Sequence, residues 1–124
     1  MADERILGEL TLVTDESDAV VTVSWLGKST ASAPGDLIGP VLLGAADRAQ
    51  ATQKRLVFAF ERLDFFNSAT ITVLLRTVRA LRSRRVTLTI RYDDGKRWQR
   101  TFFDAFSGAS LDESDDVRIE AVRA

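Results

Sequence analysis

A strand, a helix and a second strand follow one another between residues 56 and 92, and this succession constrains the fold more than any other feature. Residues 56–60 read LVFAF, a continuous apolar run that is typical of a central strand covered on both faces. Apolar residues then recur at helical spacing from Ile71 to Leu81. Residues 86–92 read VTLTIRY, in which apolar and polar residues alternate. A strand, helix and strand of these lengths predict a βαβ unit with parallel strands.

The N-terminal part of the chain is expected to contribute a hairpin and a helix. Residues 7–13 and 19–26 are rich in β-branched residues and flank a polar turn, a pattern that predicts two paired strands. Apolar residues at helical spacing predict a helix over residues 36–50. Pro40 and two glycines lower the helix propensity of its first half.

The C-terminal part is expected to add a third helix and a last strand. Aromatic residues recur at helical spacing from Trp98 to Phe106, and Gly108 is expected to end this helix. Residues 117–122 are expected to form the last strand, so the predicted order is β-β-α-β-α-β-α-β. We expect an α/β fold in a single domain of residues 1–124, with a mixed, mainly parallel sheet of about five strands and helices packed mainly on one face.

The chain has neither cysteine nor histidine among its 124 residues. The lack of cysteine excludes disulfides, thiolate zinc sites and cysteine nucleophiles. The lack of histidine excludes Ser-His-Asp catalysis, imidazole metal ligands and histidine phosphotransfer. The N-terminus lacks the basic flank of a secretory signal, and no apolar run approaches the roughly 20 residues of a membrane span. We therefore expect a cytoplasmic protein that is not an enzyme, needs no cofactor or metal, and does not insert into a membrane.

Positive charge is concentrated in one stretch of a nearly neutral chain. Between Arg76 and Arg100, nine basic residues stand against two aspartates, which gives this stretch a charge of +7 and leaves −8 elsewhere. Such asymmetry suits electrostatic steering of a protein partner. Tyr92 and Trp98 lie among the arginines, so a nucleic-acid-binding surface is a further interpretation. A solvated helix face and an aromatic core face explain the same residues more simply.

The junction FFNSA at residues 65–69, between a strand-like run and a helix, carries the strongest functional signal. Asn and Ser are favoured at helix starts because their side-chain oxygens accept hydrogen bonds from free amides. The same amides and the helix dipole favour a phosphate. Ser68 is therefore a candidate both for capping the helix and for phosphorylation, and capping alone would explain its presence.

The order of elements, the strand LVFAF, this junction and the helix sequence ITVLLR at residues 71–76 resemble the STAS domain of anti-sigma-factor antagonists. The resemblance implies a STAS-like regulatory domain without enzymatic activity, in which Ser68 falls on the position that a partner kinase phosphorylates. It implies an anti-sigma factor or serine kinase of the GHKL type and a PP2C-type phosphatase as partners. The residues expected to contact a partner surround the junction and follow the second strand: Asn67, Ala69, Thr70, Thr72, Arg76, Lys28, Ser29 and Thr30.

The junction departs from the family pattern in ways that have physical consequences. Asn67 replaces an acidic residue, Ala69 replaces a second hydroxyl residue, and Thr70 and Thr72 stand where the family usually has glycines. Asn caps a helix about as well as Asp, so the architecture is expected to persist. The missing carboxylate is expected to lower the efficiency of phosphorylation, and the threonines add bulk where a kinase would approach. The chain is also similar to divergent STAS-like regulators with Asn-Ser or Asn-Thr at this junction.

Other interpretations follow from the resemblance and from short motifs. STAS domains also occur in lipid and anion transport systems, so an accessory subunit of a transport or other signalling complex, without phosphorylation, is an alternative. The acidic residues 112–116 lack the spacing of a recognised cation loop. Gly27-Lys28-Ser29 has the end of a P-loop without its earlier glycine. Nothing in the sequence specifies an oligomeric state.

Overall fold

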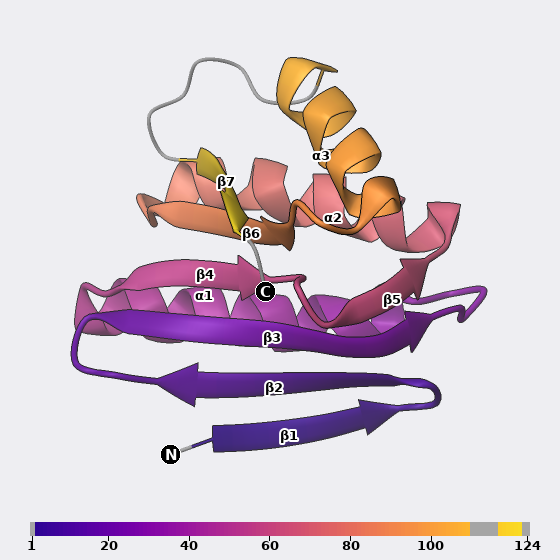
Figure 1. Cartoon of the computed structure of the whole chain (residues 1–124). Helices are drawn as coiled ribbons and strands as arrows, with labels where there is room; N and C mark the ends of the chain where they lie inside the picture. The colour runs from indigo at the N-terminus through magenta and orange to yellow at the C-terminus, as the bar shows by residue number, and fades with distance from the viewer. Residues whose placement is uncertain (1, 110–116, 123–124) are drawn as a thin grey trace.

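The computed structural model describes residues 2–109 and 117–122 of the chain. In this part, seven strands form one mixed sheet accompanied by three α-helices, so the expected α/β class is confirmed (Figure 1). The strands are β1 (Ala2–Leu7), β2 (Leu10–Glu16), β3 (Val20–Ser29), β4 (Arg55–Ala59), β5 (Leu63–Phe66), β6 (Leu88–Asp93) and β7 (Val117–Val122). The helices are α1 (Gly35–Thr52), α2 (Ser68–Leu81) and α3 (Arg97–Ala109), and a short 3-10 helix, η1 (Arg82–Arg84), follows α2.

The strand order is β1-β2-β3-β4-β6-β7, with β5 beside β3. The β1–β2 and β2–β3 pairs are antiparallel, whereas the β3–β4, β3–β5, β4–β6 and β6–β7 pairs are parallel. The parallel strands β4 and β6 flank α2 in the chain, which confirms the predicted βαβ unit. The sheet is mixed and mainly parallel, as expected.

The expected number of about five strands is wrong, first because of the N-terminus. The strand expected over residues 7–13 is interrupted by a turn at Gly8, whose φ is 69°, and the preceding residues form β1. All residues of β1 except Leu7 are exposed. No buried face therefore imposes an alternating pattern on this segment, and pairing with β2 defines the strand.

The second strand that the sequence prediction missed is β5. The long strand β3 pairs with β4 over residues 20–24 and with β5 near its end, with an irregular register between Gly27 and Lys28. Gly27 has a φ of 88°, and a Cβ atom there would lie 2.2 Å from the carbonyl oxygen of Glu9. Only glycine fits this bend without strain. β5 has four residues, too few to show a clear period in the sequence.

One face of the sheet carries the hydrophobic core. Alternate residues of neighbouring strands align across it, as in the register partners Val23, Phe58 and Ile90, which are all fully buried. α1 packs against α2 and against β3 and β4, and Figure 1 shows both helices behind the sheet. Phe103 of α3 stacks on Tyr92 of β6 with a ring-centroid distance of 5.1 Å. Because Tyr92 shares its face of the strand with Ile90, α3 extends the same core.

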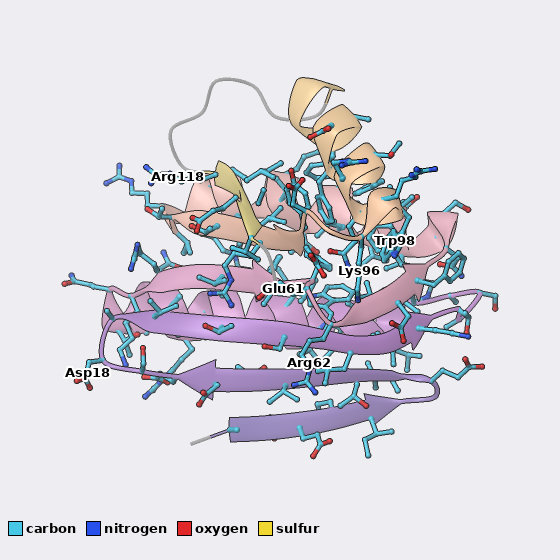
Figure 2. The ribbon with its side chains drawn as sticks, in the orientation of Figure 1. Asp18, Glu61, Arg62, Lys96, Trp98 and Arg118 are labelled. Atoms are coloured by element: carbon cyan, nitrogen blue, oxygen red, sulfur yellow. The ribbon has the colours of Figure 1, made fainter. Side chains whose placement is uncertain are left out.

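A buried glutamine holds the start of α3 in place. The Gln99 Nε2 donates hydrogen bonds to the carbonyl oxygens of Phe60 at 2.6 Å and Leu63 at 3.0 Å. Its Oε1 accepts a hydrogen bond from the amide of Asp93 at 2.7 Å. Lys96, labelled in Figure 2, adds a hydrogen bond from its Nζ to the Leu63 carbonyl at 3.2 Å. These contacts join α3 to β5, to the end of β6 and to the turn after β4.

An ion-pair cluster joins the N-terminal hairpin to α1. Glu16, at the end of β2, accepts hydrogen bonds from the Arg48 Nε at 2.7 Å and from the Lys54 Nζ at 2.5 Å. The hydrogen bond from Arg48, followed by that from Lys54, lowers the pKa of Glu16 to about 2. The carboxylate therefore stays charged in the folded protein well below its ordinary titration range.

The three predicted helices are present with small differences at their ends. α1 covers the expected residues 36–50 and extends by one residue at its start and two at its end, in spite of Pro40. α2 ends at Leu81, where η1 takes over. α3 continues past Gly108 to Ala109. The last strand has the predicted bounds. The acidic residues 112–116 lie outside the described residues.

Candidate phosphorylation and partner-binding site

The start of α2 lies at an end of the sheet where two helices begin. α1 follows β3 and α2 follows β5, and the two strands are parallel and paired (Figure 1). Both helices therefore start at the same end. The amide of Asn67 donates a hydrogen bond to the Ser29 carbonyl at 3.0 Å. The loop after β3 therefore lies beside the junction at Ser68.

Asn67, and not Ser68, caps α2. The Asn67 Oδ1 accepts hydrogen bonds from the amide of Thr70 at 2.9 Å and from the Thr70 hydroxyl at 2.7 Å. The Asn67 Nδ2 donates to the Ala31 carbonyl at 2.9 Å. A side-chain oxygen that accepts from the third helical amide is the usual N-cap arrangement. The interpretation in which the Ser68 side chain caps the helix is therefore wrong.

Ser68 is the first helical residue, and its side chain is exposed. Its hydroxyl makes no hydrogen bond with any residue in the described part of the chain. The backbone amides of Ser68 and Ala69 likewise have no acceptor within residues 2–109 and 117–122. A phosphate on this hydroxyl would meet two free amides and the positive end of the helix dipole. The site can accept a modification without losing an existing contact.

Two residues that we expected to contact a partner are buried instead. Thr70 is 0% exposed and Ser29 is 2% exposed, and their hydroxyl oxygens lie 2.6 Å apart. Because the Thr70 hydroxyl donates its hydrogen to Asn67, the Ser29 hydroxyl is the donor of this second bond. The pair therefore belongs to the scaffold: it joins the end of β3 to the first turn of α2.

The remaining predicted residues divide into two groups. Thr72 and Arg76 are exposed and Ala69 is half-buried, and these three line one hollow beside Ser68. Lys28 and Thr30 are exposed but do not line this hollow. Lys28 is the register partner of Phe65 in β5, a large apolar residue that is 46% exposed.

The hollow beside Ser68 also involves residues that the sequence analysis did not select. It has a volume of about 340 Å³, and its other wall is formed by residues 32–36 at the start of α1. Pro34 and Asp36 mark a helix start in the sequence, where proline and acidic residues are favoured. That signal places a helix end but does not indicate that α2 approaches it.

The described residues hold no cluster of side chains suited to a metal ion. Within residues 2–109 and 117–122, no group of three or more acidic side chains converges to hold a metal ion. None of the helices described here has the length and apolar character needed to cross a membrane. What the site offers is an exposed hydroxyl at a helix start, beside a hollow with an arginine on its rim.

The likeness to known proteins is confined to structure. No protein family and no curated protein matches the sequence of this chain. Among solved structures, the chain is similar to the activator SiaC in the crystal structure of diguanylate cyclase SiaD in complex with SiaC from Pseudomonas aeruginosa. The sequence identity is 18% and the TM-score is 0.65, and the match covers 96% of this chain and 98% of that chain. The likeness shows a shared α/β fold over nearly the whole length.

Proposed function

We propose that this chain is a regulatory domain without enzymatic activity that binds a protein partner around the start of α2, and that phosphorylation of Ser68 controls this binding. The observation that carries the proposal is the division of roles between two adjacent residues. Asn67 caps the helix, while the hydroxyl of Ser68 is exposed and has no partner in the described part of the chain. Following the STAS resemblance, the proposed partners are an anti-sigma factor or serine kinase of the GHKL type and a PP2C-type phosphatase.

The physical effect of the phosphate would be on the surface and not on the scaffold. A phosphoserine carries about −1.5 to −2 charges at neutral pH and accepts several hydrogen bonds. The free amides of Ser68 and Ala69 would receive it, so the domain stays folded. A partner whose interface buries the unmodified hydroxyl would have to desolvate the phosphate when Ser68 is modified, which costs several kcal/mol. That cost would change the affinity by orders of magnitude.

The named role of SiaC supports a protein partner in general. SiaC is described as the activator of a diguanylate cyclase and was crystallised in complex with it, so a domain of this fold acts by binding another protein. The role of SiaC does not favour one class of partner over another.

The nucleic-acid alternative is disfavoured by where the aromatic residues lie. Tyr92 is 7% exposed and stacks inside the core, so its ring is not accessible to bases. Trp98 is half-buried and packs edge to face against Phe66, with ring centroids 5.3 Å apart. Among the cations, Arg84 pairs with Asp47. No specific observation favours the transport alternative.

The experiment compares phosphorylation and binding in matched variants. Mass spectrometry of the protein from its own cells, under several growth conditions, is expected to find phosphate on Ser68. Ser68→Asp is expected to weaken binding of the co-purifying partner, with little change in melting temperature. Ser17→Asp is the control, because Ser17 is exposed in the turn before β3, at the opposite end of this strand from the start of α2. A phosphate-free Ser68 in all conditions, or equal effects of the two substitutions on binding, would contradict the proposal.

A further inference from the structure

The hollow beside Ser68 is the first part of a groove between α1 and α2. A second hollow, also of about 340 Å³, shares Gly35, Asp36, Val73 and Arg76 with the first and continues along both helices. It reaches Ala80 near the end of α2. The groove thus follows α2 for about 17 Å, at a rise of about 1.5 Å per residue.

The walls of the groove are built largely from small residues, and they mix apolar with polar side chains. Its remaining lining on the α1 side is Gly39 and Leu43, and on the α2 side Ala69, Thr72, Thr77 and Ala80 contribute. Glycines and alanines allow a side chain from outside to approach the two helices closely. The length fits a partner segment of about three helical turns that places apolar side chains against Leu43 and Val73.

The charges along the groove favour an acidic occupant. Arg76 lies on its rim and Arg79 on the same exposed side of α2, and neither forms an ion pair with any described residue. Asp47 of α1 is already paired with Arg84. Asp36 is the acidic residue of the lining, and it sits in the first turn of α1, where the helix dipole, equivalent to about half a positive charge, offsets part of its charge. Among the described residues, the guanidinium groups of Arg76 and Arg79 therefore have no ion pair, and they exceed the charge of the one lining carboxylate.

We infer that the groove between α1 and α2 binds an acidic, amphipathic segment of the protein partner, about three helical turns long. Apolar side chains of the segment would contact Val73 and Leu43, and a carboxylate would pair with Arg76. This inference rests on the proposed function, because it assigns the binding surface of the same partner. It also gives the switch a physical basis, because a phosphate on Ser68 would add negative charge at the mouth of a groove that receives an acidic chain.

The test uses the whole chain labelled with 15N and two synthetic peptides of about four helical turns. Both peptides carry leucines at helical spacing, and the remaining positions are glutamate in one and lysine in the other. The acidic peptide is expected to shift the amide resonances of Gly39, Val73 and Arg76. The basic peptide is expected to bind much more weakly.

Two glycines of α1 provide a matched pair of variants. A Cβ atom at Gly39 or at Gly44 would meet no other atom within 4 Å, so the helix accepts a side chain at both positions. Gly39 lines the groove, whereas Gly44 lies on the side of α1 that faces β1. Gly39→Gln is expected to lower the affinity for the acidic peptide by about tenfold or more, because the glutamine side chain fills the groove. Gly44→Gln is expected to leave affinity unchanged, and Arg76→Ala to weaken it roughly fivefold.

The outcomes separate this inference from the proposed function. Equal binding of the two peptides, no binding up to millimolar concentration, resonance shifts confined to other surfaces, or equal effects of the two glycine variants would overturn the inference. The proposed switch is tested separately by repeating the titration with Ser68-phosphorylated protein. If the phosphorylated protein binds the acidic peptide in the groove as tightly as before, phosphorylation control is contradicted, and the groove remains the binding surface. If phosphorylation abolishes partner binding but Gly39→Gln does not change it, the groove is not the binding surface, and phosphorylation control by Ser68 still holds.

Discussion

The division of roles between Asn67 and Ser68 leads to a quantitative prediction for stability. Replacing Asn67 by alanine removes the cap of α2, which costs about 0.5–2 kcal/mol. It also removes the acceptor of the Thr70 hydroxyl, which is fully buried, and the donor to the Ala31 carbonyl. Each of these hydrogen bonds is worth about 1 kcal/mol. Asn67→Ala is therefore expected to lower the free energy of unfolding by about 2–4 kcal/mol.

Ser68→Ala is expected to behave differently, although it alters the adjacent residue. The hydroxyl of Ser68 is exposed and has no partner in the described part of the chain, so the loss is expected to stay within about 0.5 kcal/mol. Asn67→Asp keeps the capping oxygen and loses only the donor to Ala31, so its cost is expected to lie between those of the two alanine variants.

Urea unfolding monitored by circular dichroism measures these differences. With a slope of about 1.5 kcal/mol/M, a loss of about 3 kcal/mol lowers the midpoint by about 2 M. Equal midpoints for Asn67→Ala and the unmodified chain would refute the assignment of the cap. A loss with Ser68→Ala as large as that with Asn67→Ala would refute the separation of scaffold and switch.

Three further predictions concern the scaffold. The pKa of Glu16 is lowered from 4.5 to about 2, so its ion pairs stabilise the fold fully above pH 4.5 and lose this effect as the pH falls toward 2. The difference in melting temperature between the unmodified chain and Glu16→Gln should therefore shrink between these two pH values, and a constant difference would contradict the ion pairs. Gln99→Met leaves the Asp93 amide without its side-chain acceptor and removes one of two donors from each of the Phe60 and Leu63 carbonyls, so it should cost about 1–3 kcal/mol in urea unfolding, and a neutral effect would contradict this role. Gly27→Ala forces a Cβ atom to within 2.2 Å of the Glu9 carbonyl and should lower the melting temperature sharply, and an unchanged melting temperature would contradict the bend.

The parts of the fold that were predictable from sequence are those in which burial leaves a periodic pattern. α2 buries Leu74, Val78 and Leu81, which the sequence displays at helical spacing. β1 has no buried face, and β5 is held by pairing with the end of β3, so neither leaves such a pattern. Hydrogen bonding of the backbone, which every residue type can supply, decides these two strands.

The candidate site was predictable only in part for a similar reason. Ser68 and Asn67 are recognisable because helix starts have strong local preferences. The burial of Ser29 and Thr70 depends on contact between residues 41 positions apart, which local sequence does not encode. The groove likewise exists because residues 35–43 approach residues 69–80 across the core. Small residues at these positions have meaning only after the two helices are placed together.

The most direct test of the account is the affinity of one purified partner for the two forms of the chain, with Ser68 unmodified and phosphorylated. Calorimetric titration and thermal melting would be measured on the same samples. We expect phosphorylation to weaken binding by about a hundredfold or more, the equivalent of about 3 kcal/mol, while the melting temperature stays within a few degrees. Equal affinities for the two forms, or unfolding of the phosphorylated chain, would contradict the central claim.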